Sequence, residues 1–118
     1  MAAPNIVSVG TITGKTSVQT VGTSYAAVVS NASSSGKVFK VNTLLVSNVD
    51  GSATADISAS LYRSSTHYRL ISTAPIPPGS TLSILPSSIY LEEGDDLQLS
   101  ASVAGDLEAV VSYEEISE

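Results

Sequence analysis

Residues 97–113, LQLSASVAGDLEAVVSY, carry the clearest structural pattern in the chain. On both sides of the turn-forming segment Ala104-Gly105-Asp106, apolar and polar residues alternate. A period of two is typical of β-strands that have one face in a core and the other in water. We therefore predict two strands joined as a hairpin. The residues expected to face the core are Leu97, Leu99, Ala101, Val103, Leu107, Ala109, Val111 and Tyr113.

Similar strand patterns recur upstream, and each is bounded by Gly, Pro, Asn, Asp or Ser. The run Lys37–Asn48 has apolar residues on both parities, which favours a β-bulge near Asn42-Thr43 that switches the buried face. Gly14-Lys15 is expected to end a first strand over Ile6–Ile12. Val49-Asp50-Gly51-Ser52 is expected to form a hairpin turn in which the glycine supplies a positive φ.

These patterns predict an all-β protein, an antiparallel β-sandwich of the jelly-roll or Ig-like type with about eight or nine short strands. The proline-rich segment Pro75–Gly79 cannot lie in an inner strand and is expected at an edge or in a crossover. We expect a single sandwich domain over residues 6–118 and a flexible N-terminal arm over residues 1–5. Because the inward residues are small, the core buries modest area, and we expect a homo-oligomer, with a trimer as one form.

Composition argues against several classes of function. The 118 residues contain 5 Lys+Arg and 11 Asp+Glu, so the formal net charge is -6. So few cations cannot neutralise many phosphates, which argues against binding to nucleic acid. The absence of cysteine excludes disulfides, cysteine zinc sites and thiol nucleophiles. No apolar run approaches the roughly 18 residues of a membrane span and the first residues lack signal-peptide features, so we expect a soluble protein without a membrane partner.

His67 is the single histidine of the chain, and it follows Ser64, Ser65 and Thr66. A hydroxyl and an imidazole are two parts of a nucleophilic site, but a third group must also orient the imidazole. Proximity along a serine-rich chain does not indicate such an arrangement. We therefore interpret His67 as a solvent-exposed residue of a turn or strand, and we predict no catalytic residue and no enzymatic activity.

The densest charge cluster is the segment Glu92-Glu93-Gly94-Asp95-Asp96. Four carboxylates around a glycine turn could hold Ca²⁺. The ligands would be Glu92, Glu93, Asp95 and Asp96. However, the spacing differs from that of an EF-hand loop, and neighbouring strand residues point to opposite faces. We favour a solvated turn without metal or cofactor, in which Gly94 has a positive φ and Asp95 accepts hydrogen bonds from local backbone amides.

Two tyrosines and two arginines flank a predicted hairpin. They are Tyr62, Arg63, Tyr68 and Arg69. Together they could form an exposed aromatic and cationic patch, so we predict them as interface residues. Exposed tyrosine rings could also bind carbohydrate. The alternative is that the tyrosines pack at the ends of the sandwich with their hydroxyls hydrogen-bonded.

Four segments, Lys37–Asn48, Ile89–Asp96, Leu97–Val103 and Leu107–Ile116, occur in an order that resembles a known family. Along the chain, an early strand is followed by a strand of small alternating residues. A loop containing Ile-Pro-Pro-Gly-Ser-Thr and then a Tyr-Leu-Glu-Glu-Gly-Asp turn come after it. The family is that of small virion structural proteins of tailed bacteriophages, notably those of cyanobacteria and other aquatic bacteria. The resemblance covers residues 20–118. Its motifs are turns and strands, so it implies no catalytic residues.

The resemblance implies a β-sandwich protein of the virion, synthesised and assembled in the host cytoplasm. Our first hypothesis within this family is a capsid decoration or cement protein that binds assembled shell subunits and stabilises the particle. Its partners would be other virion structural proteins, the major capsid protein first. A position in the neck, tail or fibre is an alternative. A carbohydrate- or receptor-binding module and a small hydrolase that uses His67 are alternatives from other classes.

Overall fold

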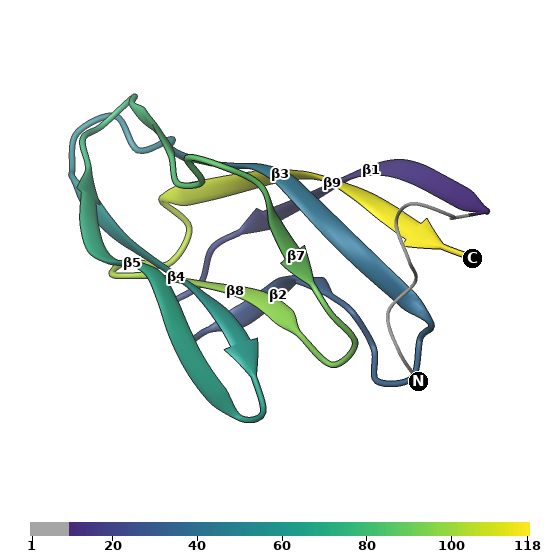
Figure 1. The fold of residues 1–118 in the computed structure, drawn as a ribbon. Helices are drawn as coiled ribbons and strands as arrows, with labels where there is room; N and C mark the ends of the chain where they lie inside the picture. The colour runs from purple at the N-terminus through teal and green to yellow at the C-terminus, as the bar shows by residue number, and fades with distance from the viewer. Residues whose placement is uncertain (1–9) are drawn as a thin grey trace.

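The computed structural model describes residues 10–118, which form nine β-strands in two facing sheets (Figure 1). The strands are β1 (Thr11–Thr20), β2 (Ala26–Ser30), β3 (Lys37–Asn48), β4 (Ala55–Arg63), β5 (Thr66–Ile76), β6 (Thr81–Ser83), β7 (Ile89–Leu91), β8 (Asp96–Ala101) and β9 (Leu107–Ser117). The predicted antiparallel sandwich is confirmed, whereas the arm predicted over residues 1–5 lies outside the described residues. None of residues 10–118 forms a helix, so this part of the chain has no helix that could cross a membrane.

The order of the strands is that of a jelly roll rather than of an Ig domain. One sheet has the order β1-β9-β3-β6, with β7 also paired to β3, and the other has the order β2-β8-β4-β5. β8 and β9 therefore lie in opposite sheets, and the hairpin predicted over residues 97–113 is wrong. Alternation along a strand identifies its buried face but carries no information about which strand lies beside it.

The buried faces of β8 and β9 are as predicted for all but two residues. Tyr113 is only partly buried, although it packs against the core. Val103 is exposed, because it lies in the connection between the two strands and not in either of them. The buried residues are Leu97, Leu99, Ala101, Leu107, Ala109 and Val111.

β3 contains the bulge that its sequence predicts. The register between β3 and β9 shifts between Val41 and Thr43. One extra residue reverses the parity of the buried face. Phe39 and Val41 before the bulge and Leu44 and Val46 after it consequently all belong to one core.

β1 continues through Gly14-Lys15, so the strand end predicted there is wrong. Its ten residues pair with β9 in one uninterrupted register, from Thr11 opposite Ser117 to Thr20 opposite Glu108. A long ladder of backbone hydrogen bonds to β9 outweighs the low strand propensity of a single glycine.

The hairpin turn predicted for Val49–Ser52 is also wrong, because β3 and β4 belong to different sheets. Gly51 does not adopt a positive φ. The loop is shaped instead by Asp50, whose carboxylate accepts hydrogen bonds from the backbone N–H groups of Ala53 at 2.6 Å and Ser52 at 3.2 Å. These bonds lower the pKa of Asp50 from its ordinary value.

β4 and β5 form a hairpin whose two central residues are both left-handed. Ser64 has a φ of 52° and Ser65 a φ of 61°, and Arg63 is paired with Thr66. Two positive φ values define a type I′ turn, which follows the right-handed twist of its strands. Glycine adopts this conformation freely, whereas serine is strained in it.

We predict that Ser65→Gly stabilises the chain by about 0.5–1 kcal/mol, because glycine removes the strain of the left-handed residue. Ser87→Gly is the matched control, since Ser87 is exposed and lies outside the left-handed region. The free energy of unfolding in urea should rise for Ser65→Gly and not for Ser87→Gly. An equal change in both variants would contradict the strain argument.

Candidate functional site

The two tyrosines predicted at the interface lie on the β4–β5 hairpin but do not share a face. Tyr62 is opposite His67, whereas Tyr68 is opposite Leu61. Side chains of neighbouring strand residues point to opposite faces, so Tyr62 and Tyr68 project in opposite directions from the sheet. Tyr68 is exposed and Tyr62 is half-buried. The single patch suggested by the sequence is therefore not formed.

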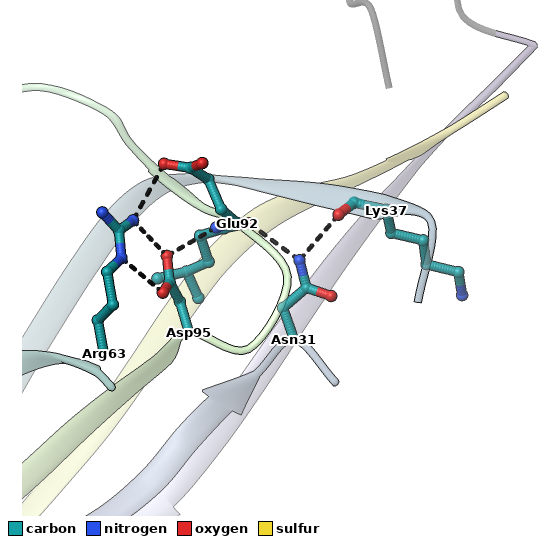
Figure 2. A network of polar contacts seen from close by, with 6 residues as sticks. Asn31, Lys37, Arg63, Glu92 and Asp95 are labelled. Atoms are coloured by element: carbon teal, nitrogen blue, oxygen red, sulfur yellow. Dashed lines mark hydrogen bonds and ion pairs between the residues drawn. The ribbon is translucent and has the colours of Figure 1, made fainter. Parts of the chain in front are cut away.

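The two arginines also separate. Arg69 lies opposite Ser60 and is exposed, whereas Arg63 reaches the turn between β7 and β8. Arg63 donates from Nε to Oδ1 of Asp95 at 2.7 Å and from Nη2 to Oδ2 of the same carboxylate at 2.5 Å (Figure 2). Nη2 also donates to Glu92 Oε2 at 3.1 Å. This bidentate pairing of a guanidinium with a carboxylate is a strong charge-assisted arrangement, and Asp95 raises the pKa of Arg63.

Asp95 closes its own turn as well as pairing with Arg63. Its Oδ2 accepts a hydrogen bond from the backbone N–H of Glu92 at 2.8 Å, and its backbone N–H donates to the carbonyl of Glu92 at 3.0 Å. Gly94 has a φ of 88°, which confirms the predicted glycine turn. The turn is not simply solvated, however, because Asp95 is only 1% exposed. The buried carboxylate is tolerated because it is paired.

Asn31 connects this turn to the loop that precedes β3 (Figure 2). Its backbone N–H donates to the carbonyl of Asp95 at 2.9 Å, and its carbonyl accepts from the N–H of Gly94 at 2.8 Å. Its side-chain Nδ2 donates to the carbonyls of Leu91 at 3.0 Å and Lys37 at 2.9 Å. Nothing in the sequence distinguishes Asn31 from the small polar residues that follow it, so sequence reasoning missed this contact.

The four carboxylates suggested as Ca²⁺ ligands do not converge. Asp96 turns away and accepts a hydrogen bond from Ser30 Oγ at 2.5 Å. Glu93 accepts one from the backbone N–H of Gly36 at 2.8 Å. The other two face Arg63, which supplies the positive charge among them. Within residues 10–118, no group of three or more acidic or histidine side chains is arranged to hold a metal ion.

His67 is half-buried rather than solvent-exposed, so that expectation is wrong. Its ring lies between Tyr25 and Tyr62, with ring-centroid separations of 4.2 Å and 4.5 Å. Its Nδ1 is hydrogen-bonded to Oγ of Ser60 at 2.7 Å. Ser60, seven residues earlier in the chain, is its hydroxyl partner, and not the serines and threonine directly before it.

The Ser60–His67 pair does not have the arrangement of a nucleophilic site. Ser60 is fully buried, so a substrate cannot reach its hydroxyl. In a catalytic triad one imidazole nitrogen meets the nucleophile and the other meets an orienting acid. Here Ser60 occupies Nδ1, and the tyrosine rings cover the imidazole. The hydrogen bond between Ser60 and His67 and the two tyrosine rings instead pack side chains on the outer face of the sheet that contains β4 and β5.

Glu115 lies in the acidic C-terminal strand β9 and is mostly buried between two lysines of its own chain. Lys37 Nζ lies 2.6 Å from Oε1, and Lys15 Nζ lies 3.0 Å from Oε2. Hydrogen bonds from Lys37 and Lys15 lower the pKa of Glu115, and the same carboxylate raises the pKa of Lys15. Three strands, β1, β3 and β9, are thereby connected at one end of the sheet.

Comparison with known proteins adds evidence on the fold. No family model matches the chain, and no curated protein matches it. A solved structure described as "Bacillus endospore appendages form a novel family of disulfide-linked pili" resembles it with a TM-score of 0.54. The match covers 92% of this chain and 88% of the other at 12% sequence identity. A likeness at this identity concerns the fold alone.

We predict that Arg63→Gln lowers the free energy of unfolding by about 2–3 kcal/mol, because it leaves the buried Asp95 carboxylate without its cation. Arg69→Gln is the matched control, since Arg69 is exposed on the same hairpin. Urea unfolding of both variants measures the difference. Equal stability of the two variants would show that the Arg63–Asp95 pair contributes nothing to the fold.

We predict that Glu115→Gln lowers stability at neutral pH by about 1 kcal/mol, because two partly exposed lysines lose their partner. The pKa of Glu115 is lowered in the folded chain, so its contribution is complete above the unfolded-state pKa of about 4.3. It disappears as the pH falls through the lower folded-state pKa. Urea unfolding across this range tests the sign, with the exposed Glu108→Gln as control. A difference that persists at the lowest pH would contradict it.

Proposed function

We propose that the chain is a non-enzymatic structural subunit of a bacteriophage virion, and that it binds the assembled capsid as a decoration or cement protein. The resemblance to small virion proteins supports this proposal. The segments that carry it coincide with β3, β7, β8, β9 and the turn that holds Asp95.

The observation that carries the proposal is an uncharged row of apolar side chains across the outer face of one sheet. Val18 on β1 lies opposite Val110 on β9, and Val110 lies opposite Leu45 on β3. Val18 is 72% exposed and Val110 is 42% exposed. Neither belongs to the buried core, so much of this apolar surface is available to another protein. Burial against another protein would gain about 25 cal/mol per Å².

The chemistry of the polar groups also supports a structural role. The Arg63–Asp95 pair and the Glu115–lysine group connect strands and turns of this chain. His67 is covered by tyrosine rings. Tyr62 and Tyr68 lie on opposite faces, which disfavours a joint carbohydrate platform. These features favour a binding protein over a hydrolase or a carbohydrate-binding module.

The structural neighbour is described as forming pili, so a sandwich of this fold can serve as a subunit of an assembly. Those pili are disulfide-linked, whereas the 118 residues of this chain contain no cysteine. Contacts that these residues make in an assembly therefore cannot include disulfide bonds. A protein that binds the assembled shell and not its free subunits stabilises the shell by mass action.

The proposal predicts that purified protein raises the heat resistance of capsids assembled without it. Val110→Lys should abolish this effect, because a charge in the apolar row cannot be buried without a partner. Val103→Lys is the control, since Val103 is exposed in the connection between β8 and β9. Electron microscopy of decorated particles should show protein over the shell. Protein confined to one vertex would indicate a neck or tail location, and unchanged heat resistance would refute the cement role.

A further inference from the structure

The edges of the two sheets differ in how well they are protected from pairing with another strand. Pro residues, bulges and very short strands are the usual means of protection. β5 contains Pro75 and its register with β4 shifts twice. β2 has five residues and a register shift, and β6 and β7 have three residues each. Among these edge strands, β1 alone is long and has an unbroken register.

The backbone groups that β1 presents outward follow from its pairing with β9. The N–H of Val21 donates to the carbonyl of Leu107 at 2.9 Å, and the register of β1 continues from this pair without a shift. In an antiparallel pair, residues alternate between bonding to the partner strand and pointing away from it. The odd-numbered residues of β1 therefore bond to β9. The N–H and carbonyl groups of Ile12, Gly14 and Thr16 face the open edge.

Among residues 10–118, no strand pairs with the outer side of the segment Thr11–Thr16. The C-terminal half of β1 lies beside β2, because Ser17 Oγ donates to the carbonyl of Val28 at 2.7 Å and Gln19 Nε2 to that of Ala27 at 3.1 Å. All residues from Thr11 to Thr16 are exposed. We call these six residues the β1 edge.

A lysine can protect an edge by repelling an incoming strand. The β1 edge contains one charged residue, Lys15, and its ammonium is paired with Glu115 at 3.0 Å. The other residues of the edge are threonines, Ile12 and Gly14. Its side chains therefore offer little resistance to a second strand.

We propose that the β1 edge pairs antiparallel with the β1 edge of a second copy of this chain, forming a two-fold dimer with one continuous sheet. A two-fold axis at Thr13 places Ile12 opposite Gly14 of the other copy and Lys15 opposite Thr11. Ile12 is 55% exposed, and a Cβ added at Gly14 would meet no atom within 4 Å, so there is room for the isoleucine. No like charges face each other, and the two Thr13 residues form a favourable cross-strand pair.

This pairing goes beyond the proposed binding to capsids and uses a different surface. Capsid binding would use the outer face of the sheet at Val18 and Val110, whereas dimer formation uses the backbone at the edge. The closed two-fold symmetry of the dimer satisfies the outward N–H and carbonyl groups of Ile12 and Gly14 in both copies. It leaves the apolar row of both copies on the same side of the continuous sheet.

Gly14→Pro and Gly14→Ala form a matched pair that tests the proposal. Proline removes the outward N–H of residue 14 and leaves the bonds to β9 intact, whereas alanine keeps that N–H. Sedimentation equilibrium over a range of concentrations should show dimers for the wild type and Gly14→Ala. Gly14→Pro should be monomeric throughout that range, with a far-ultraviolet spectrum that is still typical of β-sheet.

Ile12→Lys is a second variant that does not depend on the tolerance of β1 for proline. Ile12 is exposed, so a lysine there is compatible with the fold, but it places two uncompensated cations diagonally across the two-fold axis. It should also be monomeric, with Val103→Lys remaining dimeric. A monomeric wild type, or dimers of Ile12→Lys as stable as those of the wild type, would overturn the proposal.

The capsid assay separates the two proposals. If the wild type is monomeric but protects capsids, the second-copy pairing fails and the proposed function stands. If Gly14→Pro abolishes dimers of the wild type, but the wild type does not protect capsids, the proposed function fails and the second-copy pairing stands. If Gly14→Pro still forms dimers but no longer binds capsids, the partner of the β1 edge is a strand of a shell protein. The second-copy proposal is then wrong.

Discussion

The buried carboxylate of Asp95 stabilises the end of the sandwich at which the chain passes from β7 in one sheet to β8 in the other. β7 belongs to one sheet and β8 to the other, and Asp95 lies in the turn between them. A charge in this position is stable only if a cation and hydrogen-bond donors accompany it. Arg63 supplies the cation and the backbone of Glu92 supplies a donor. Pairing with Arg63 fixes the turn against the β4–β5 hairpin, and backbone hydrogen bonds of Gly94 and Asp95 fix it against the loop at Asn31.

Several ionisable groups have partners within the chain. The carboxylate of Glu115 connects three strands at one end of the first sheet, and the imidazole of His67 is packed among side chains of the second. The exposed part of the first sheet includes the apolar row at Val18 and Val110 and the long, unbroken edge of β1. Both are suited to contacts with other protein chains, in which neutral backbone and apolar side chains are buried.

The candidate site was predictable from the sequence only where it depends on neighbouring residues. The glycine turn at Gly94 follows from local turn chemistry, as does the acceptance of a backbone N–H by Asp95. The partner of Asp95 is 32 residues away along the chain, and that of Glu115 is 78 residues away in the case of Lys37. No local pattern connects residues at such separations, so these pairs became evident only in the folded chain.

The sequence by itself determined the strands, their buried faces and the bulge of β3, because side-chain alternation and turn residues act over a few neighbouring positions. Tertiary structure alone decided which strands lie side by side. It placed β8 and β9 in opposite sheets, carried β1 straight through Gly14, and turned Tyr62 and Tyr68 to opposite faces. Strand pairing depends on closing long loops and burying two sheets against each other, and that free energy belongs to the whole chain and not to any segment of it.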